Sequence, residues 1–124
     1  MKIDLEKLPR ERKDFSIKLS GDFGEAEFFG FYFKDGSFLA IDGAIRGDIY
    51  VICDISGERF VDILNEKLKI KVTNGSYKGF DEEYDIVECD SGIFDFEAFL
   101  EDEIKMFQND YHKKQEFGNG ELEI

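Results

Sequence analysis

The sequence of 124 residues lacks several features that would place it in a class directly. It has one proline and no tryptophan, so the ring geometry of proline bars almost no strand or helix. It contains no apolar run near the roughly 20 residues that a membrane-spanning helix requires. Residues 1–15 lack the apolar core of a secretory signal, and we therefore expect a cytoplasmic protein with reduced thiols.

The sequence has too few cysteines and histidines for the metal and catalytic sites that these residues commonly form. Cys53 and Cys89 are the two cysteines, and His112 is the one histidine. A structural zinc site needs four ligands, often in Cys-x-x-Cys pairs, and here Ser56 stands where the second thiol would be. We therefore expect no metal and no cofactor, with Cys53 buried as a small apolar residue and His112 solvated at the surface. A nucleophilic Cys53 would need a nearby base, whereas its neighbours in sequence are acids.

Positive charge is also scarce, because 16 Lys and Arg stand against 29 Asp and Glu and give a net charge of −13. Since phosphate affinity comes from Lys and Arg, nucleic-acid binding by the whole surface is disfavoured, and a cationic partner fits better. The charge is uneven, with a net of +2 over residues 1–13, +3 over residues 66–79, and eleven acids without a base over residues 81–103. An acidic surface that only aids solubility is the alternative interpretation.

Phenylalanine and alternating apolar residues are what the sequence has in quantity. Hydrophobic residues make up 42% of the chain and 14 residues are phenylalanine, which indicates one globular domain with a core of Phe and Ile. Alternation predicts strands over residues 15–21, 25–34 and 37–41, with tight turns at Asp35-Gly36 and Asp42-Gly43. Strands that follow one another through short turns are expected to be antiparallel neighbours.

The stretch from Asp42 to Phe60 predicts a strand, a turn and a return strand. Alternate residues from Ile45 to Cys53 share one face of the first strand, and Phe60 turns inward from the second. Residues 67–73 alternate again, with apolar residues inward and lysines outward. The dipeptide Asn74-Gly75 then predicts a further hairpin, followed by a short strand over residues 84–88.

One amphipathic helix is predicted near the end of the chain. Apolar residues recur at three- and four-residue steps from Phe96 to Tyr111, and Asp95 stands where an N-cap belongs. The predicted fold class is α+β, mainly β: an antiparallel curled sheet or barrel-like meander with one C-terminal amphipathic helix. We expect a single domain over residues 1–117 and a flexible tail over residues 118–124.

Two charged segments are the candidate binding sites. Alternate lysines on the outer face of a strand can follow a phosphate backbone, and the candidate RNA contacts are Lys67, Lys69, Lys71 and Lys78. An edge strand protected from aggregation by lysine is the alternative. The acidic run lacks the spacing of a calcium-binding loop, and its candidate contacts for a basic partner are Asp81, Glu82, Glu83 and Asp85.

Three stretches of the chain form a combined pattern: DGAIRGDIYVICDISGERF, the Leu-x-Ile-x-Val strand that follows it, and IFDFEAFLEDEI. Together they resemble the YceD family, the large ribosomal RNA subunit accumulation proteins of bacteria and plastids. In that family a Gly-rich strand runs into Cys-x-x-Cys-Leu-x-x-Phe, and an Ile-Asp-Leu segment opens a helix after an acidic stretch. Cys53 and Phe60 match the first cysteine and the phenylalanine, Ser56 replaces the second cysteine, and Asp95 matches the aspartate.

The resemblance implies a non-enzymatic factor in ribosome biogenesis that supports accumulation of large-subunit (23S) ribosomal RNA. Its partner would be ribosomal RNA or a basic ribosomal protein of the large subunit, with no membrane and no small-molecule substrate. The resemblance identifies no catalytic residue. Two other classes stay open: a small ligand-binding β-barrel or enzyme whose pocket Phe28, Phe31 and Phe33 would line, and an acidic decoy that mimics nucleic acid.

Overall fold

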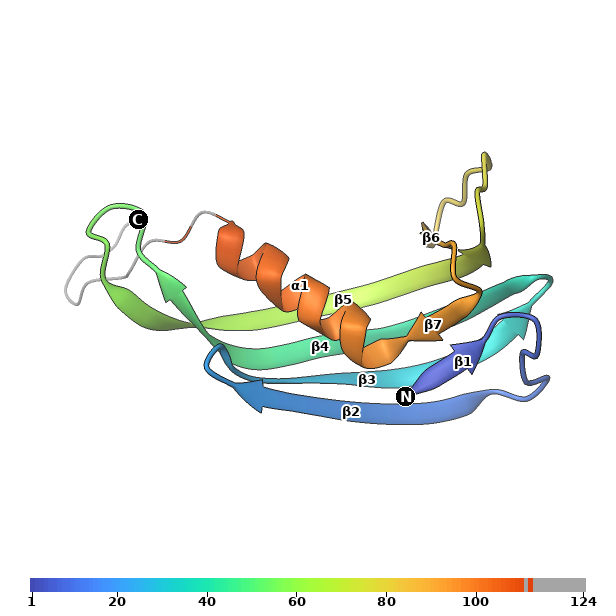
Figure 1. Ribbon diagram of the computed structural model, residues 1–124, viewed down its shortest axis with the longest axis horizontal. Coiled ribbons are helices and arrows are strands. Elements are labelled where there is room, and N and C mark those ends of the chain that lie inside the picture. Colours follow the sequence, from blue (N-terminus) through green and yellow to red (C-terminus); the bar gives the residue numbers. More distant parts are fainter. Residues whose placement is uncertain (111, 113–124) are drawn as a thin grey trace.

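The computed structural model describes residues 1–110 and residue 112, and the predicted tail over residues 118–124 lies outside this part. A five-stranded sheet in the order β2-β3-β4-β5-β6 forms the body, one helix crosses it, and β1 and β7 form a small separate sheet (Figure 1). The elements are β1 (Lys2–Asp4), β2 (Lys13–Gly21), β3 (Gly24–Asp35), β4 (Phe38–Ile52), β5 (Arg59–Asn74), β6 (Asp85–Cys89), β7 (Ile93–Asp95) and α1 (Phe96–Asn109). The predicted fold class is confirmed, with a curled sheet that is not closed into a barrel.

The predicted turn at Asp42-Gly43 is wrong, because β4 runs through both residues without interruption. Gly43 lies opposite Gly30 of β3, and Gly30 has a φ of +149°. A Cβ atom at Gly30 would lie only 2.5 Å from the Cα atom of Gly43. The two glycines therefore let β3 and β4 approach where a side chain would collide, which explains a turn-like dipeptide inside a strand.

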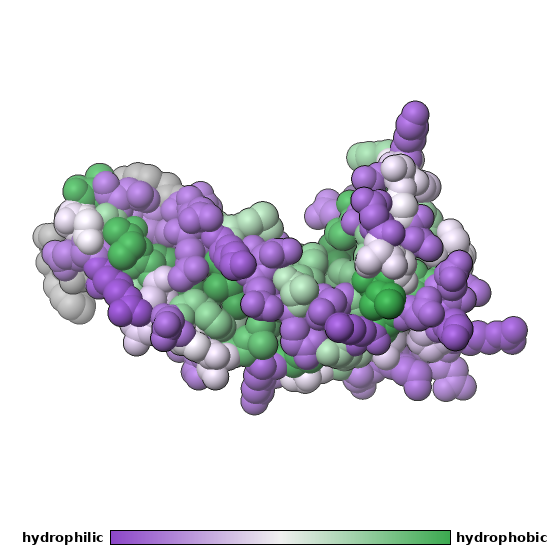
Figure 2. Space-filling view, viewed as in Figure 1, coloured by the Kyte–Doolittle hydropathy of each residue, from purple (hydrophilic) through white to green (hydrophobic). Residues whose placement is uncertain are grey.

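The predicted hairpin at Asn74-Gly75 is also wrong. β6 pairs with β5 in the parallel direction, with Ile70 opposite Asp85 and Asn74 opposite Cys89. The chain does turn at Gly75, which has a φ of +88°. Residues 75–84 then form a loop that projects at one end of the sheet and carries the chain back before it pairs (Figures 1 and 2). Turn residues set a local bend, but they do not set the direction of a strand ten residues later.

The core lies between α1 and one face of the sheet. Apolar residues alternate along the strands, so each strand sends one set toward the helix. Phe28, Phe96 and Leu100 are fully buried, and the ring of Phe15 meets the rings of Phe28 and Phe96 edge-on, with 4.9 Å between centroids in each pair. The predicted N-cap is confirmed, since a carboxylate oxygen of Asp95 accepts a hydrogen bond from the Ala98 backbone at 3.1 Å.

A pair of carboxyl groups also joins α1 to the sheet. Glu66 comes from β5 and Glu103 from α1, and the Oε1 atom of Glu66 is buried without a hydrogen-bond partner. Burial and the hydrogen bond with Glu66 raise the pKa of Glu103 to about 8. A protonated Glu103 can therefore donate to Glu66 across the contact between α1 and β5.

Replacing Leu100 by Ala is expected to lower the free energy of unfolding by about 2–5 kcal/mol, because it leaves a cavity under α1. The matched control is Met106→Ala, since Met106 is exposed on the same helix; its effect is expected to stay within about 0.5 kcal/mol. Urea unfolding followed by circular dichroism measures both. Equal losses for the two variants would contradict the helix face that we describe.

The Glu66–Glu103 pair predicts that stability falls as pH rises. Folding takes up a proton between the ordinary pKa of 4.5 and the folded value of about 8, so the free energy of unfolding declines across this window. Glu103→Gln still offers a donor but does not titrate, and it is expected to flatten much of this slope. Glu101→Gln, on the exposed part of the helix, serves as the control and keeps the slope. Urea unfolding at pH 5, 6.5 and 8.5 tests this, and an unchanged slope in Glu103→Gln would refute it.

Candidate functional site

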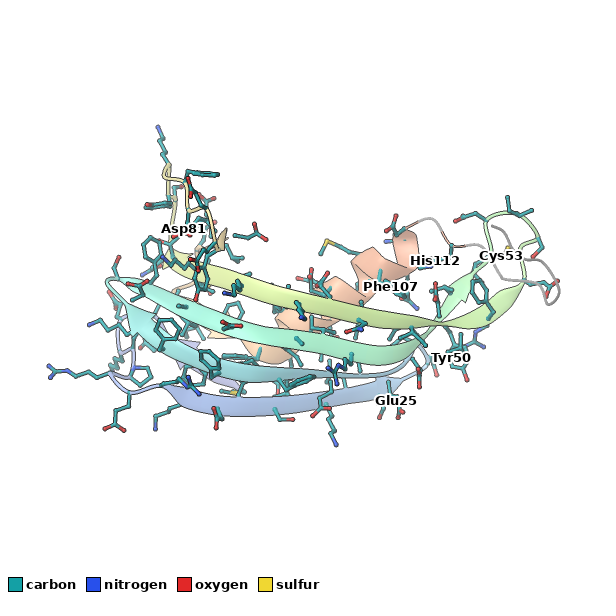
Figure 3. The ribbon with its side chains drawn as sticks, turned by 180° about the vertical axis from the view of Figure 1, so that it is seen from behind. Glu25, Tyr50, Cys53, Asp81, Phe107 and His112 are labelled. Atoms are coloured by element: carbon teal, nitrogen blue, oxygen red, sulfur yellow. The ribbon has the colours of Figure 1, made fainter. Side chains whose placement is uncertain are left out.

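The face of the sheet opposite α1 is not covered by any element of the described residues. Figure 3 views the molecule from this side, with the helix behind the sheet. Alternate residues of β2 to β5 point outward here, and six of them are acidic and six basic. The acids are Asp14, Glu25, Glu27, Asp35, Asp42 and Asp48, and the bases are Lys18, Arg46, Arg59, Lys67, Lys69 and Lys71. The outward residues of β2 to β5 therefore balance in charge, in a chain whose net charge is −13.

A shallow hollow of about 530 Å³ lies on the uncovered face. Two rows of neighbouring residues cross four strands and line it. One row is Lys18, Glu27, Arg46 and Asn65, and the other is Ser20, Glu25, Asp48 and Ile63. Charges of opposite sign alternate along the first row, so the hollow suits a polar ligand or a polymer backbone better than an apolar molecule.

Arginine side chains stack on aromatic rings along this face. The guanidinium carbon of Arg12 lies 4.0 Å from the centre of the Phe31 ring, and that of Arg59 lies 4.1 Å from the centre of the Tyr50 ring. Arg46 lies over a third ring at 5.3 Å. Aromatic faces and guanidinium planes are the surfaces on which unpaired nucleobases stack, so each pair is a potential stacking site.

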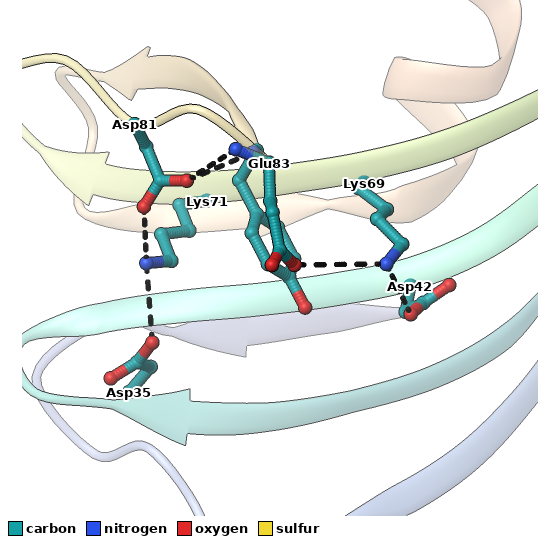
Figure 4. A network of polar contacts seen from close by, with 7 residues as sticks. Asp35, Asp42, Lys69, Lys71, Asp81 and Glu83 are labelled. Atoms are coloured by element: carbon teal, nitrogen blue, oxygen red, sulfur yellow. Dashed lines mark hydrogen bonds and ion pairs between the residues drawn. The ribbon is translucent and has the colours of Figure 1, made fainter.

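The structure brings the predicted lysine contacts and the predicted acidic contacts together (Figure 4). The ammonium of Lys71 lies 2.7 Å from a carboxylate oxygen of Asp81 and 3.2 Å from one of Asp35. The ammonium of Lys69 lies 3.9 Å from oxygens of both Asp42 and Glu83. The two segments thus partly neutralise each other instead of forming separate surfaces of opposite sign.

Asp81 organises the loop between β5 and β6. Its carboxylate also accepts hydrogen bonds from the backbone of Glu83 at 2.9 Å and of Tyr84 at 3.0 Å. The hydrogen bond from Lys71, with these two backbone bonds, lowers the pKa of Asp81 to about 2. The Lys71 side chain is only 14% exposed, so its contacts hold the loop against the sheet. The four other predicted contacts, Lys67, Lys78, Glu82 and Asp85, are exposed.

The prediction of a solvated His112 is wrong, because its side chain is only 5% exposed. Ring atom Nδ1 lies 2.9 Å from a carboxylate oxygen of Asp62, and Nε2 contacts the carbonyl oxygen of Phe107. Only the protonated imidazolium can donate at both atoms. Burial opposes protonation, but the bonds to Phe107 and Asp62 outweigh it and raise the pKa of His112 above its ordinary value. The sequence held no local sign of this contact, since Asp62 is 50 residues away.

Cys53 is buried as predicted, at the turn of the confirmed β4–β5 hairpin. Its sulfur accepts a hydrogen bond from the Ser56 backbone at 3.5 Å, and Phe60 packs at the edge of the core. Cys53 and His112 lie at the same end of the molecule (Figure 3). Both ring nitrogens of His112 face other acceptors, however, so the pair lacks the nucleophile–base contact of covalent catalysis.

The three phenylalanines proposed for a ligand pocket do not share one. Phe28 is fully buried beneath α1, whereas Phe31 and Phe33 stack on each other on the uncovered face, with ring centres 6.1 Å apart. Among residues 1–110 and 112, no group of three or more His, Cys, Asp and Glu is arranged to hold a metal ion. The described part of the chain also has no helix long and apolar enough to cross a membrane.

No family model, no curated protein and no solved structure matches the chain. The resemblance to the YceD family therefore stays a prediction that rests on the three sequence stretches. The uncovered face has to be interpreted from its own geometry.

The single histidine makes the His112 contact directly measurable. We expect its pKa, followed by the imidazole resonances in NMR, to lie above 6.5 in the wild-type protein. Its stabilising contribution is then full below pH 6.5 and is lost as pH rises through the folded pKa. Asp62→Asn removes the carboxylate partner and is expected to lower this pKa, while Asp48→Asn on the uncovered face leaves it unchanged. A wild-type value at or below 6.5 would contradict the contact.

Proposed function

We propose that this protein is a non-enzymatic factor in ribosome biogenesis that acts in the cytoplasm, supports accumulation of large-subunit ribosomal RNA and contacts RNA with the uncovered face. The sequence stretches that resemble the YceD family support the biological role. The stacks of Arg12 on Phe31 and of Arg46 on Phe29, in the central part of the uncovered face, support the mode of contact.

The observation that carries the proposal is the balance of acids and bases among the outward residues of β2 to β5, in a strongly acidic chain. A polyanion is repelled by a surface of net charge −13, and the repulsion is weakest where acids and bases balance. RNA would therefore meet the protein in one orientation, with the uncovered face toward it. The acidic remainder would limit nonspecific binding, since its negative charge repels phosphates.

Contact would begin with unpaired bases and not with a duplex. An unstacked base can take the place of the guanidinium on Phe31, which releases Arg12 to reach a phosphate. Lys67 and Lys69 extend along the outward side of β5 and supply further phosphate contacts. Lys71 is assigned a structural role in this proposal, because it holds Asp81 and Asp35.

A small-ligand site is the second candidate, and the hollow lined by Lys18, Glu27 and Arg46 is the observation that favours it. Its paired charges would suit a zwitterionic or otherwise polar molecule. The hollow is open to solvent across four strands, which is poor confinement for a catalysed reaction.

Deleting the gene is expected to lower the ratio of 23S to 16S ribosomal RNA, and the wild-type protein is expected to restore it. A protein with both Phe31→Ala and Lys67→Ala is expected not to restore it, because it has lost a stacking ring and a phosphate contact. Quantitative electrophoresis of total RNA measures the ratio.

The control variant is Phe80→Ala, which removes an 84% exposed aromatic ring from the loop between β5 and β6. It should restore the ratio as fully as the wild-type protein does. A normal ratio in the deletion strain would rule out the proposed role, and restoration by the double variant would rule out the proposed surface.

A further inference from the structure

The end of the β4–β5 hairpin carries an exposed apolar patch. β3 begins at Gly24, opposite Ile49, so beyond this point β4 pairs with β5 alone, apart from a hydrogen bond from the Tyr50 backbone to the carbonyl oxygen of Phe23. Four outward residues at this end of β4 and β5, and one in the turn, are between 40% and 70% exposed. We call Tyr50, Ile52, Ile55, Val61 and Ile63 the tip patch.

The tip patch is contiguous, which distinguishes it from ordinary surface residues. Tyr50 lies directly opposite Val61. Ile52 follows Tyr50 on the same face toward the turn, and Ile63 follows Val61 on the same face in the opposite direction. Single exposed apolar residues are normal, but a set packed across two strands marks an interaction surface. β-Branched residues on an uncovered hairpin also favour aggregation, so their presence there calls for a partner that covers them.

The hairpin is held rigidly from behind. On its other face Val51 and Cys53 are buried, and His112 bonds to both Asp54 and Asp62. The side-chain amide of Gln108 on α1 donates to the backbone oxygen of Tyr50 at 2.9 Å. A patch fixed in this way loses little conformational entropy when a partner covers it.

The charges around the tip patch indicate the chemistry of that partner. Acidic residues surround it, namely Asp22, Asp48, Asp54 and Glu58. Among residues 1–110 and 112, the base that contacts the patch is Arg59, which stacks on Tyr50 and donates to the backbone oxygen of Asp22 at 3.1 Å. A second copy of this chain would bring a second acidic rim and a second charge of −13, and RNA would bring phosphates, so both are repelled.

We propose that the tip patch docks a basic polypeptide segment whose apolar side chains cover Ile52, Val61 and Ile63 and whose Lys or Arg side chains meet the acidic rim. Aliphatic side chains on the partner fill the space over the hairpin, and the opposite charges fix its orientation. The inference deepens the proposed function by giving the factor a protein partner. It does not require that the central part of the uncovered face bind RNA.

A short amphipathic Leu/Lys peptide is the first probe, with a Leu/Glu peptide and a Ser/Lys peptide as controls. We expect only the Leu/Lys peptide to bind, with NMR shift changes concentrated at residues 48–63. Ile52→Asp and Ile63→Asp are each expected to weaken binding by about tenfold or more, whereas Phe80→Asp stays within about twofold. Equal binding of the Ser/Lys peptide, or equal affinity in the patch variants, would overturn the proposal.

A photo-crosslinker placed at position 63 in cells is the second test. The expected adduct is a basic protein that, once purified, binds the wild-type chain and loses about tenfold or more in affinity to Ile52→Asp. Adducts only with RNA, only with a second copy, or with an acidic protein would overturn the proposal. The double variant Phe31→Ala, Lys67→Ala is expected to keep this affinity. The experiment therefore distinguishes an error in the proposed RNA surface from an error in the proposed docking at the tip patch.

Discussion

Helix α1 packs Phe96, Leu100 and Ile104 against one face of the sheet, and this contact determines which residues are left for binding. The sheet has five strands and the described chain has one helix, so one layer can cover one face only. The opposite face is therefore exposed to water although it carries aromatic residues of β3 and β4. Arginine stacking and balanced charge make this exposure tolerable, and the same features are what a ligand would recognise.

Polar contacts under the helix fix the far end of the molecule. The Glu66–Glu103 pair joins α1 to β5, and the contact of His112 with Asp62 joins a residue just beyond α1 to the same strand. Both contacts weaken as pH rises, so the docking of the helix and the rigidity of the β4–β5 tip depend on proton uptake in the same direction. A surface held by such contacts is preorganised near neutral pH, which is a condition for selective binding.

Local patterns predicted the local parts of this structure. The inward residues of β4, the burial of Cys53 and the start of the helix at Asp95 all follow from periodicity or capping within a few residues. The parallel pairing of β6, the straight passage of β4 through Asp42 and Gly43, and the burial of His112 depend on partners that lie far away in the chain. The Lys71–Asp81 contact was likewise not predictable, because it depends on the conformation of the loop and not on a periodic pattern in the sequence.

The central claim is that the uncovered face and the adjoining tip of the hairpin meet the partners of this protein, while the helix side stays in solvent. Carbene footprinting of the chain alone and in cell extract tests this most directly, because it labels side chains according to their exposure. The account predicts that labelling falls at Phe31, Lys67 and Ile63 in extract and stays constant at Glu101 and Met106 on the helix. Protection confined to the helix side would contradict it.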